Sequence, residues 1–463
     1  MKYKKDEIVT VKIEDIGNDG SGIGKDNGFT IFIKDTVIGD LVTARIMKVK
    51  TNFAYAKLEK VETPSLFRVT PKCAISCQCG GCQLQVLDYK AQLEYKQSKV
   101  RNNLIRIGGF TSNQIDTVLE PMIGMENEFR YRNKAQYPFG YDKAGNLVTG
   151  FYAGRTHDII ANTDCLLGDE RNQEILEALI FYMKANHIAA YCEKSGSGFV
   201  RHVLIRSGFY TGEMMVCLVV CAKKKFDLPK QQDLIDALVK IPGMTGIFIN
   251  LNPDKTNVIM GKKGYRIWGE ERIHDKLGDL TFQISPLSFF QINTHQAEKL
   301  YHLALEYANL TGHETVWDLY CGIGTISLYM ARKAKQVFGI EIVPEAVQDA
   351  RINAEMNRIK NAQFFVGKAE EILPKKYGKE NIHADIVIID PPRKGCDIDC
   401  LETIIKMKPN RIVYVSCDSA TLARDLRILC EKGYVLTRVR PVDQFGQTIH
   451  VESVALLVID ISS

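Results

Sequence analysis

Long hydrophobic runs are absent from this sequence. The longest apolar stretch, residues 214–222, is far shorter than the roughly 18 residues that a membrane-spanning helix requires. The first residues are charged and lead into no apolar core of the kind that marks a secretory signal. Internal repeats and low-complexity linkers are absent as well, which excludes a solenoid. We therefore expect a globular protein of the cytoplasm, with no membrane partner.

Disulfide bonds and a strong net charge are not expected either. Although the chain has 13 cysteines, cytoplasmic proteins seldom keep disulfides, and the number is odd. The formal net charge is only +5 over 463 residues, and the apolar share of 45% and the charged share of 25% are those of an ordinary globular protein. A chain of this length is expected to fold into about two to four domains.

Positive charge is concentrated in two short segments. Residues 41–60 hold five basic side chains against one acid, and residues 89–106 hold five against one. Such segments can meet the phosphates of a nucleic acid, but a solvated charged face has the same composition.

The first of these segments lies in a region that has the pattern of short strands. Strands are expected at 8–13, 29–33, 41–46 and 53–61, with a glycine-rich turn over 17–24. This pattern predicts a small closed barrel, a shape often used against nucleic acid, although a purely structural barrel would have the same pattern. A mixed region of helices and strands follows from about residue 117 to 278.

From about residue 282, apolar strands alternate with helix-length segments. A helix is expected over 293–310, with Asn293 as its cap. The strands are expected at 315–319, 337–340, 363–366, 386–389, 411–415 and 451–459. This order predicts a mostly parallel sheet with helices on both faces, whose ligands bind beyond the C-terminal ends of the strands.

Acidic residues and glycines stand at those strand ends. Asp318 ends one strand and is followed by a turn with Gly322, while Glu341 and Asp390 end two later strands. The dinucleotide fingerprint requires a third glycine where this chain has Ser327, so no pyrophosphate site is indicated. The acids suit a ribose and an amino-acid ammonium instead, which favours S-adenosylmethionine as the cofactor over a dinucleotide.

Two further side chains have the chemistry of a reaction site. Cys417 follows the expected strand 411–415, at the sheet edge where ligands bind, although a lone cysteine is most often a small buried hydrophobe. Glu452 begins the last strand, where it is either an exposed strand entrance or a general base in a dry pocket. After Asp390-Pro-Pro, Arg393 stands where an aromatic residue would indicate methylation of an exocyclic amine, so an amine target is disfavoured.

At this point the chain resembles the bacterial RNA (uracil-5-)methyltransferase family, and within it the 23S ribosomal RNA branch that carries an N-terminal TRAM barrel. The resemblance covers nearly the whole length. It rests on four motifs together: Asp-Leu-Tyr-Cys-Gly-Ile-Gly-Thr at 318–325, Asp-Pro-Pro-Arg-Lys-Gly at 390–395, Ser-Cys at 416–417 with 421–426, and His-Val-Glu-Ser-Val-Ala-Leu at 450–456.

The resemblance implies a mechanism and a cofactor pocket. Cys417 would attack carbon 6 of uracil so that carbon 5 can take the methyl group of S-adenosylmethionine, and Glu452 would then remove the carbon 5 proton. Gln291, Tyr320, Glu341 and Asp390 match cofactor-pocket positions. Family members commonly follow the nucleophile with Asn-Pro, whereas this chain has Asp418-Ser419, which puts the local shape and the acidity of the thiol in doubt.

The resemblance also implies a metal centre. Cys73, Cys79 and Cys82 have the spacing of the family's four-iron cluster motif, and Cys165 matches its fourth ligand. Thiolates bind zinc as well as clusters, so spacing alone leaves a [4Fe-4S] cluster, zinc and an empty site open, with the cluster favoured. Cys77 is an extra thiol.

The implied fold is a Rossmann-like α/β methyltransferase domain with a mostly parallel sheet, an N-terminal small OB-like β-barrel and a mixed α+β central domain. The barrel is expected over 1–62, the central domain with the cysteine cluster over 63–90 and 124–280, and the methyltransferase domain over 91–123 and 281–463.

Residues 129–134 and Arg201-His202 combine basic and aromatic or imidazole groups that suit unstacked RNA, although a polar strand surface would have the same pattern.

The expected partner is 23S ribosomal RNA, with no obligate protein partner evident. Transfer RNA is the alternative substrate. A non-catalytic RNA-binding protein that keeps a methyltransferase-like domain is the rival from another class.

Overall fold

The computed structural model describes residues 3–154, 156–380 and 382–460. The chain divides into two compact units. The first comprises Met1–Ser98, Phe151–Ile160 and Phe445–His450, and the second comprises Lys99–Gly150, Ala161–Gln444 and Val451–Ser463. The three-domain division expected from the sequence remains a prediction. No helix of the described ranges is long and apolar enough to cross a membrane.

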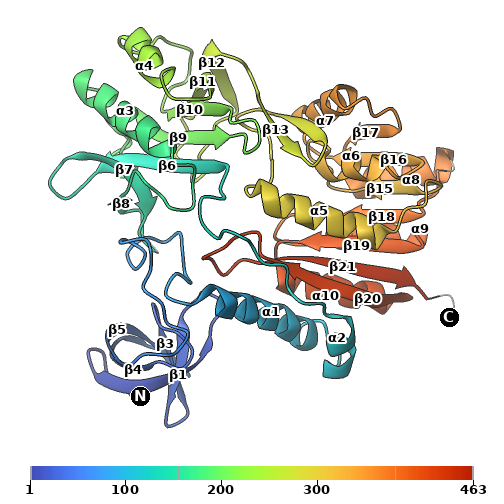
Figure 1. The fold of residues 1–463 in the computed structure, drawn as a ribbon, viewed down its shortest axis with the longest axis horizontal. Coiled ribbons are helices and arrows are strands. Elements are labelled where there is room, and N and C mark those ends of the chain that lie inside the picture. The colour runs from blue at the N-terminus through green and yellow to red at the C-terminus, as the bar shows by residue number, and fades with distance from the viewer. Residues whose placement is uncertain (1–2, 155, 381, 461–463) are drawn as a thin grey trace. The chain divides into compact units, whose positions relative to one another are not determined.

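A closed five-stranded barrel forms the start of the first unit (Figure 1). Its strands, in the spatial order β1-β2-β3-β5-β4, are β1 (Ile8–Ile16), β2 (Gly22–Asp26), β3 (Phe29–Ile33), β5 (Phe53–Thr63) and β4 (Leu41–Val49). Only β3 and β5 pair in parallel. From Ile8 to Ile13 every second side chain of β1 points inward, and Ile13, Ile31 and Ile33 are almost wholly buried in the interior. The predicted barrel is thus confirmed.

The glycine-rich turn was predicted too long, because strand β2 begins inside it at Gly22. A Cβ atom on Gly22 would lie 2.0 Å from the hydroxyl oxygen of Thr36, and one on Gly24 would lie 2.8 Å from a methyl group of Val11. Close packing within the barrel therefore requires these glycines, just as a turn would. The sequence composition alone does not distinguish a glycine in a strand from a glycine in a turn.

A mixed region follows the barrel. Two helices come first, α1 (Tyr89–Arg106) and α2 (Ser112–Val118). A seven-stranded sheet has the order β12-β11-β10-β9-β6-β7-β8. Its elements and the hairpin after it are β6 (Lys134–Tyr141), β7 (Leu147–Tyr152), β8 (Ile159–Ala161), α3 (Asn172–Ala185), β9 (Val200–Ser207), β10 (Met214–Val220), α4 (Gln231–Leu238), β11 (Met244–Leu251), β12 (Lys263–Gly269), β13 (Ile273–Leu277) and β14 (Leu280–Ile284).

The C-terminal part of the second unit contains the mostly parallel sheet that was predicted. The strand order is β17-β16-β15-β18-β19-β21-β20, and only the pairings of β21 with β19 and β20 are antiparallel. Its elements are α5 (Thr294–Ala308), β15 (Thr315–Asp318), α6 (Thr325–Ala331), β16 (Gln336–Glu341), α7 (Pro344–Met356), β17 (Ala362–Val366), α8 (Ala369–Glu380), β18 (Ile386–Ile389), α9 (Ile398–Met407), β19 (Arg411–Ser416), α10 (Ser419–Cys430), β20 (Tyr434–Val442) and β21 (Glu452–Ile459).

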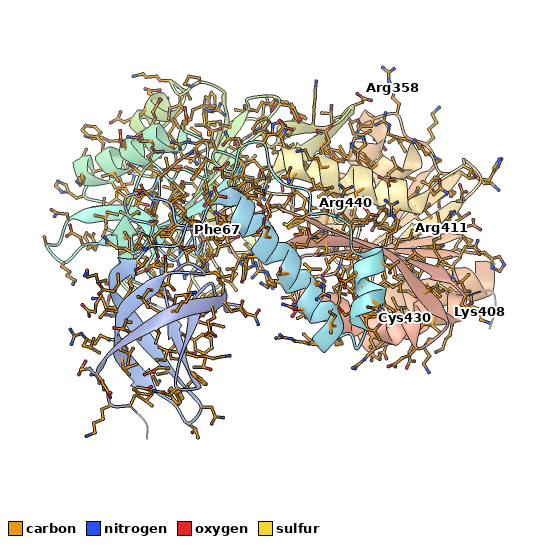
Figure 2. All side chains as sticks on the ribbon, turned by 60° about the horizontal axis from the view of Figure 1, so that its bottom comes forward. Phe67, Arg358, Lys408, Arg411, Cys430 and Arg440 are labelled. Atoms are coloured by element: carbon orange, nitrogen blue, oxygen red, sulfur yellow. The ribbon has the colours of Figure 1, made fainter. Side chains whose placement is uncertain are left out.

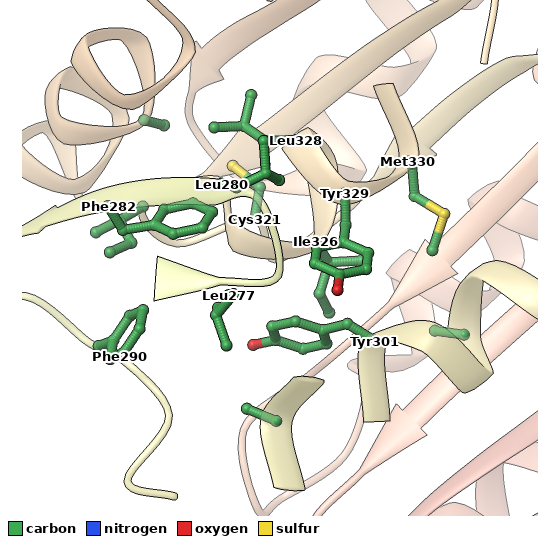
Figure 3. Packing of buried hydrophobic residues seen from close by; sticks show 14 of the residues in the cluster. Leu277, Leu280, Phe282, Phe290, Tyr301, Cys321, Ile326, Leu328, Tyr329 and Met330 are labelled. Atoms are coloured by element: carbon green, nitrogen blue, oxygen red, sulfur yellow. The ribbon is translucent and has the colours of Figure 1, made fainter. Parts of the chain in front are cut away.

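Both faces of this sheet are covered by apolar side chains. Along β15, Val316 packs into the layer formed with α5, α6 and α7, whereas its neighbour Trp317 packs into the layer formed with α9 and α10. Figure 3 shows part of the first layer, in which Tyr301 and Tyr329 lie beside Leu277 of the hairpin. Strands buried on both faces read as continuous apolar runs, and for this reason their sequences were recognisable.

The strand order has a switch point between β15 and β18. The chain leaves β15 toward β16 and β17 on one side, and then returns to β18 on the other side. The loops after β15 and β18 therefore diverge at the C-terminal edge of the sheet, which leaves a crevice where ligands of such folds bind.

An extended segment between α2 and β6 runs beside the outer strand β20. The amide of Glu120 donates to the carbonyl oxygen of Val439 at 2.8 Å, and that of Ile123 donates to Pro441 at 2.9 Å. The guanidinium of Arg440, labelled in Figure 2, donates to the carbonyl oxygen of Pro121 at 3.0 Å. This segment covers the edge that β20 would otherwise expose.

Candidate active site

Asp318 brings a buried carboxylate to the C-terminal end of β15. The hydroxyl of Ser327 donates to its Oδ2 atom at 2.6 Å, while Oδ1 is buried without a hydrogen-bond partner among the described residues. Burial raises the pKa of this carboxyl to about 6. A buried acceptor that lacks a donor fits a ligand that supplies an ammonium or hydroxyl group.

The glycine turn after Asp318 meets the carboxylate of Glu341. Gly322 has a φ of +54°, which favours glycine, and a Cβ atom there would meet no other atom within 4 Å. Its amide donates to Glu341 Oε2 at 3.2 Å, and the amide of Val343 donates to Oε1 at 2.9 Å. Two backbone donors thus fix the carboxylate of Glu341 at the end of β16, beside an open turn.

These residues fit S-adenosylmethionine. The buried Oδ1 atom of Asp318 is suited to the ammonium of the methionine part, and Glu341 to the ribose hydroxyls. Ile342 and Val343 follow Glu341 and leave 59% and 46% of their surfaces exposed, an apolar face suited to an adenine ring. These residues could therefore hold the cofactor at this edge of the sheet.

Asp390 follows β18 and begins the loop of the Asp-Pro-Pro-Arg-Lys-Gly motif. Its pKa is raised to about 7, first by burial and then by the negative charge of Asp318. Helix α10 holds the loop. The amide of Cys396 donates to Asp425 Oδ2 at 2.9 Å, and Arg424 donates to the carbonyl oxygen of Lys394 at 3.1 Å. The 390–395 and 421–426 motifs therefore form one hydrogen-bonded assembly.

Cys417 lies between the end of β19 and the start of α10. Asp418 is the N-cap of α10, and its Oδ1 atom accepts from the amides of Ala420 and Thr421 at 2.9 and 3.1 Å. The departure from Asn-Pro thus preserves a well-capped helix immediately after the thiol. Asp418 therefore caps the helix that begins directly after the thiol.

The pKa of the Cys417 thiol is affected by burial, by three acidic side chains, Glu452, Asp390 and Asp418, and by the guanidinium of Arg393. Burial raises its pKa to about 12, with further contributions from the negative charges of Glu452 and Asp390, while Arg393 opposes them. Glu452 is only 3% exposed, so the exposed-strand interpretation is wrong. Burial and the charge of Asp390 raise the pKa of Glu452 to about 8, again against Arg393. Cys417, Glu452, Asp390 and Arg393 therefore form one electrostatic cluster.

Gln291 and Tyr320 also lie in the second unit. Gln291 is 5% exposed, and its Oε1 atom accepts from Gln444 Nε2 at 3.3 Å. Tyr320 is half-buried, and its hydroxyl lies 3.6 Å from the sulfur of Cys396. The cofactor role of both residues remains a prediction.

Two residues of the site were missed as functional groups. Arg393 was considered only as the replacement of an aromatic residue, yet it is the cation that lowers the pKa of both Cys417 and Glu452. The buried hydroxyl of Tyr301 lies 3.2 Å from that of Thr325 and close to Asp390, whose charge helps to raise its pKa. Arg393 follows two prolines at the end of a strand, and this position could have marked it as a functional residue. Tyr301 carried no such signal, because its helical spacing is that of a core residue.

Replacing Arg393 with alanine is expected to make the Cys417 thiol less reactive. Loss of the opposing charge raises its pKa still further above the ordinary value of a thiol, so the thiolate fraction at pH 8 falls by about threefold or more, whereas Arg393→Lys retains most of it. Alkylation by iodoacetamide, followed on the Cys417 peptide by mass spectrometry between pH 7 and 10, measures the change. Equal rates in the wild type and Arg393→Ala would contradict it.

The cysteine motif forms a stretch of turns between β5 and α1 of the first unit. Cys73, Cys79 and Cys82 are partly exposed, and the amide of Gly81 donates to the sulfur of Cys79 at 3.3 Å. Within the described residues, no group of three or more histidine, cysteine or acidic side chains is arranged to hold a metal ion. Cys165 belongs to the second unit. The metal site that includes Cys165 therefore remains a prediction.

The expected RNA contacts of Arg201 and His202 are wrong. Both residues are buried in β9, at 4% and 6% exposure. The guanidinium of Arg201 donates to the carbonyl oxygens of Asn252 and Asp254 at 3.0 and 2.6 Å, and burial lowers the pKa of His202 to about 4. Strand β9 is buried on both faces, so its polar residues serve the interior.

Comparison with known proteins shows the family to which the chain belongs. A TRAM domain matches residues 4–58, and the tRNA (uracil-5-)-methyltransferase family matches residues 255–459. An uncharacterized RNA methyltransferase of Clostridium tetani is 46% identical over 458 residues, which cover 99% of this chain and 97% of the relative. The chain belongs to the RNA (uracil-5-)methyltransferase family. A second relative of this RNA methyltransferase, from Bacillus cereus, is 47% identical and covers 98% of this chain.

A solved structure matches nearly all of this RNA methyltransferase. It is the Pyrococcus abyssi tRNA (uracil-54, C5)-methyltransferase in complex with S-adenosyl-L-homocysteine. The match has a TM-score of 0.76 and 28% sequence identity, and it covers 97% of this chain and all of the other. The fold prediction is confirmed, and the protein is an S-adenosylmethionine-dependent RNA methyltransferase with an RNA-binding TRAM barrel.

Proposed function

We propose that this methyltransferase methylates carbon 5 of a uridine in 23S ribosomal RNA through a covalent bond between Cys417 and carbon 6. The observation that carries the proposal is the electrostatic cluster of Cys417, Glu452, Asp390 and Arg393 at the C-terminal edge of the sheet. A nucleophile and a proton acceptor close together in a buried site are what this reaction needs.

The chemistry assigns one task to each residue. S-adenosylmethionine supplies an electrophilic methyl group when bound. The Cys417 thiolate forms a bond to carbon 6, and the electron pair of the carbon 5–carbon 6 double bond moves into an enolate, which makes carbon 5 nucleophilic. After carbon 5 is methylated, Glu452 accepts its remaining proton. The electron pair of that C–H bond restores the double bond, and Cys417 leaves as a thiolate.

The protonation states set limits on this sequence of steps. With a pKa of about 12, the thiol of Cys417 keeps its proton at neutral pH, so attack depends on deprotonation that Arg393 favours. With a pKa of about 8, Glu452 is mostly neutral at pH 7 and becomes an effective base as the pH rises toward 8. We therefore expect turnover to increase between pH 7 and pH 9.

Ribosomal RNA is preferred by the resemblance to the TRAM-bearing branch with the cysteine motif. Transfer RNA is the second candidate, favoured by the nearly full-length match to a solved tRNA (uracil-54, C5)-methyltransferase. A non-catalytic RNA-binding protein has no need of a partly buried cysteine and a buried glutamate beside a cofactor pocket. The substrate alternatives are therefore two classes of RNA.

Mapping of 5-methyluridine in cells tests the substrate. Ribosomal and transfer RNA from cells that have the gene, lack it, or carry Cys417→Ser are digested and analysed by mass spectrometry. Loss of 5-methyluridine from 23S RNA both in the cells that lack the gene and in the cells that carry Cys417→Ser supports the proposal. Loss confined to transfer RNA moves the substrate to the second candidate, and no loss from either RNA overturns both.

We further propose that Cys73, Cys79, Cys82 and Cys165 hold a [4Fe-4S] cluster, with zinc as the alternative ligand. The cysteine spacing supports this by resemblance alone, and no step of methyl transfer depends on it. Anaerobically purified protein is expected to be brown with visible absorption that Cys79→Ser removes and Cys77→Ser preserves. If the protein holds equimolar zinc and has no visible absorption, the site is a zinc site and not a cluster site. A metal-free protein would exclude both metals.

A further inference from the structure

A pocket of about 300 Å³ opens in the second unit, outside the residues assigned to methyl transfer. It lies between the segment around Phe129, the loop that carries Phe209 and the first turns of α5. Its lining combines aromatic rings, amides, His295 and the cations Arg130 and Lys299. Rings and cations around one concave site are the features that recognise unstacked nucleotides.

Phe209 supplies a ring that is held in place but partly open. It is 43% exposed, and its centroid lies 4.3 Å from that of the His295 ring. The hydroxyl of Tyr210 lies 3.2 Å from His295 Nδ1 and donates to Glu298 at 3.0 Å, which fixes the orientation of the imidazole. A supported and half-exposed phenyl ring can stack on a base without further ordering cost.

Positive charge lies at the same pocket. The Lys299 ammonium is 3.4 Å from the carboxylate of Glu126, whose side chain is 93% exposed. An ion pair of this exposure contributes little, so a phosphate can displace Glu126 readily. Arg130 is held more firmly, because its guanidinium donates to Asp164 at 2.6 Å. Lys299 is therefore the better phosphate ligand.

Two residues that line the pocket are connected by hydrogen bonds to Gln291, which is a predicted cofactor-pocket residue. Asn293 and Gln296 donate to the carbonyl oxygens of Gln444 and Asp443 at 3.3 and 2.9 Å. Gln444 in turn donates to the side chain of Gln291 at 3.3 Å. This short path links the pocket to Gln291, which suits a pocket for a nucleotide near the target.

We propose that this pocket binds a second, non-target unpaired base of the RNA substrate, stacked on Phe209, with a neighbouring phosphate on Lys299. The inference rests on the proposed function in one respect, because its ligand is the RNA strand that carries the target uridine. Extrusion of the target uridine disrupts stacking next to it, and a pocket for a second base offsets part of that cost. The pocket thereby contributes to the choice of RNA sequence or shape.

Fluorescence anisotropy with a fluorescein-labelled single-stranded RNA of about 12 nucleotides tests the pocket on the full-length protein. Phe209→Ala is expected to raise Kd by about five- to hundredfold through the loss of base stacking. Phe181→Ala is the matched control, because Phe181 is 75% exposed on α3 and does not line the pocket. Its Kd is expected to remain that of the wild type.

Glu126→Gln provides a test that misfolding cannot imitate. Removing the competing carboxylate frees Lys299, so binding at low salt is expected to tighten by about twofold or more, and Lys299→Ala is expected to cancel the gain. A Kd of Phe209→Ala equal to that of Phe181→Ala, or no tightening in Glu126→Gln, overturns the inference. If the wild type binds this RNA in the pocket but forms no adduct with 5-fluorouridine RNA, the proposed function fails and the pocket stands.

Discussion

Cys417→Ser is expected to lose methyl transfer by at least about a thousandfold, because a serine hydroxyl is a far weaker nucleophile than a thiolate toward carbon 6. Activation of carbon 5 depends on that bond, so the remaining groups of the site cannot compensate. Binding of S-adenosylmethionine is expected to be unchanged, since Asp318 and Glu341 are untouched. Transfer of labelled methyl groups to RNA in single-turnover reactions measures the loss, and calorimetry measures cofactor binding.

Cys430→Ser is the matched control for this variant. Cys430, labelled in Figure 2, is half-buried at the end of the same helix α10 that starts beside Cys417. Its substitution is expected to leave the rate within about twofold of the wild type. A Cys417→Ser protein that keeps more than about a tenth of the wild-type rate would contradict the covalent mechanism.

Glu452→Gln is expected to stop the reaction after methylation and to accumulate RNA bound to the protein. The amide cannot accept the carbon 5 proton, so turnover falls by about 10²- to 10⁴-fold. The charge of Glu452 helps to raise the pKa of Cys417, so removing it lowers that pKa and leaves attack on carbon 6 at least as fast. Denaturing gels with methyl-labelled cofactor are expected to show the label in a protein–RNA band.

Glu431→Gln serves as the control for loss of a carboxylate nearby in the chain, because Glu431 is exposed at the end of α10. It is expected to turn over normally and to accumulate no labelled band. Normal turnover by Glu452→Gln would assign the base to another residue. Loss of turnover without a trapped band would place Glu452 before methylation.

The elements that carry the site could be predicted because each has a strong local signal. The strands of the parallel sheet are buried on both faces and therefore stand out as apolar runs. Asn293 was predicted to cap α5, and its side chain accepts from the amide of Gln296 at 3.2 Å. The structure adds a second cap of this kind, Asp418, at the start of α10 beside the nucleophile candidate.

Other features depend on neighbours that are distant in the chain. Strand β20 was missed because arginines and a proline interrupt its apolar residues, and its pairing with β21 supplies the order instead. The buried state of Arg201 depends on carbonyl groups some fifty residues later, at Asn252 and Asp254. The influence of Arg393 on Cys417 likewise arises only when the ends of β18 and β19 are brought together.

Peptide mapping of the protein–RNA adduct tests the central claim most directly. The wild-type protein is incubated with S-adenosylmethionine and structured RNA that contains 5-fluorouridine, which retains fluorine where Glu452 would remove a proton. The account predicts one cross-linked peptide, with methylated 5-fluorouridine attached to the sulfur of Cys417. A nucleotide attached to any other residue, or RNA that is methylated with no covalent intermediate, would contradict it.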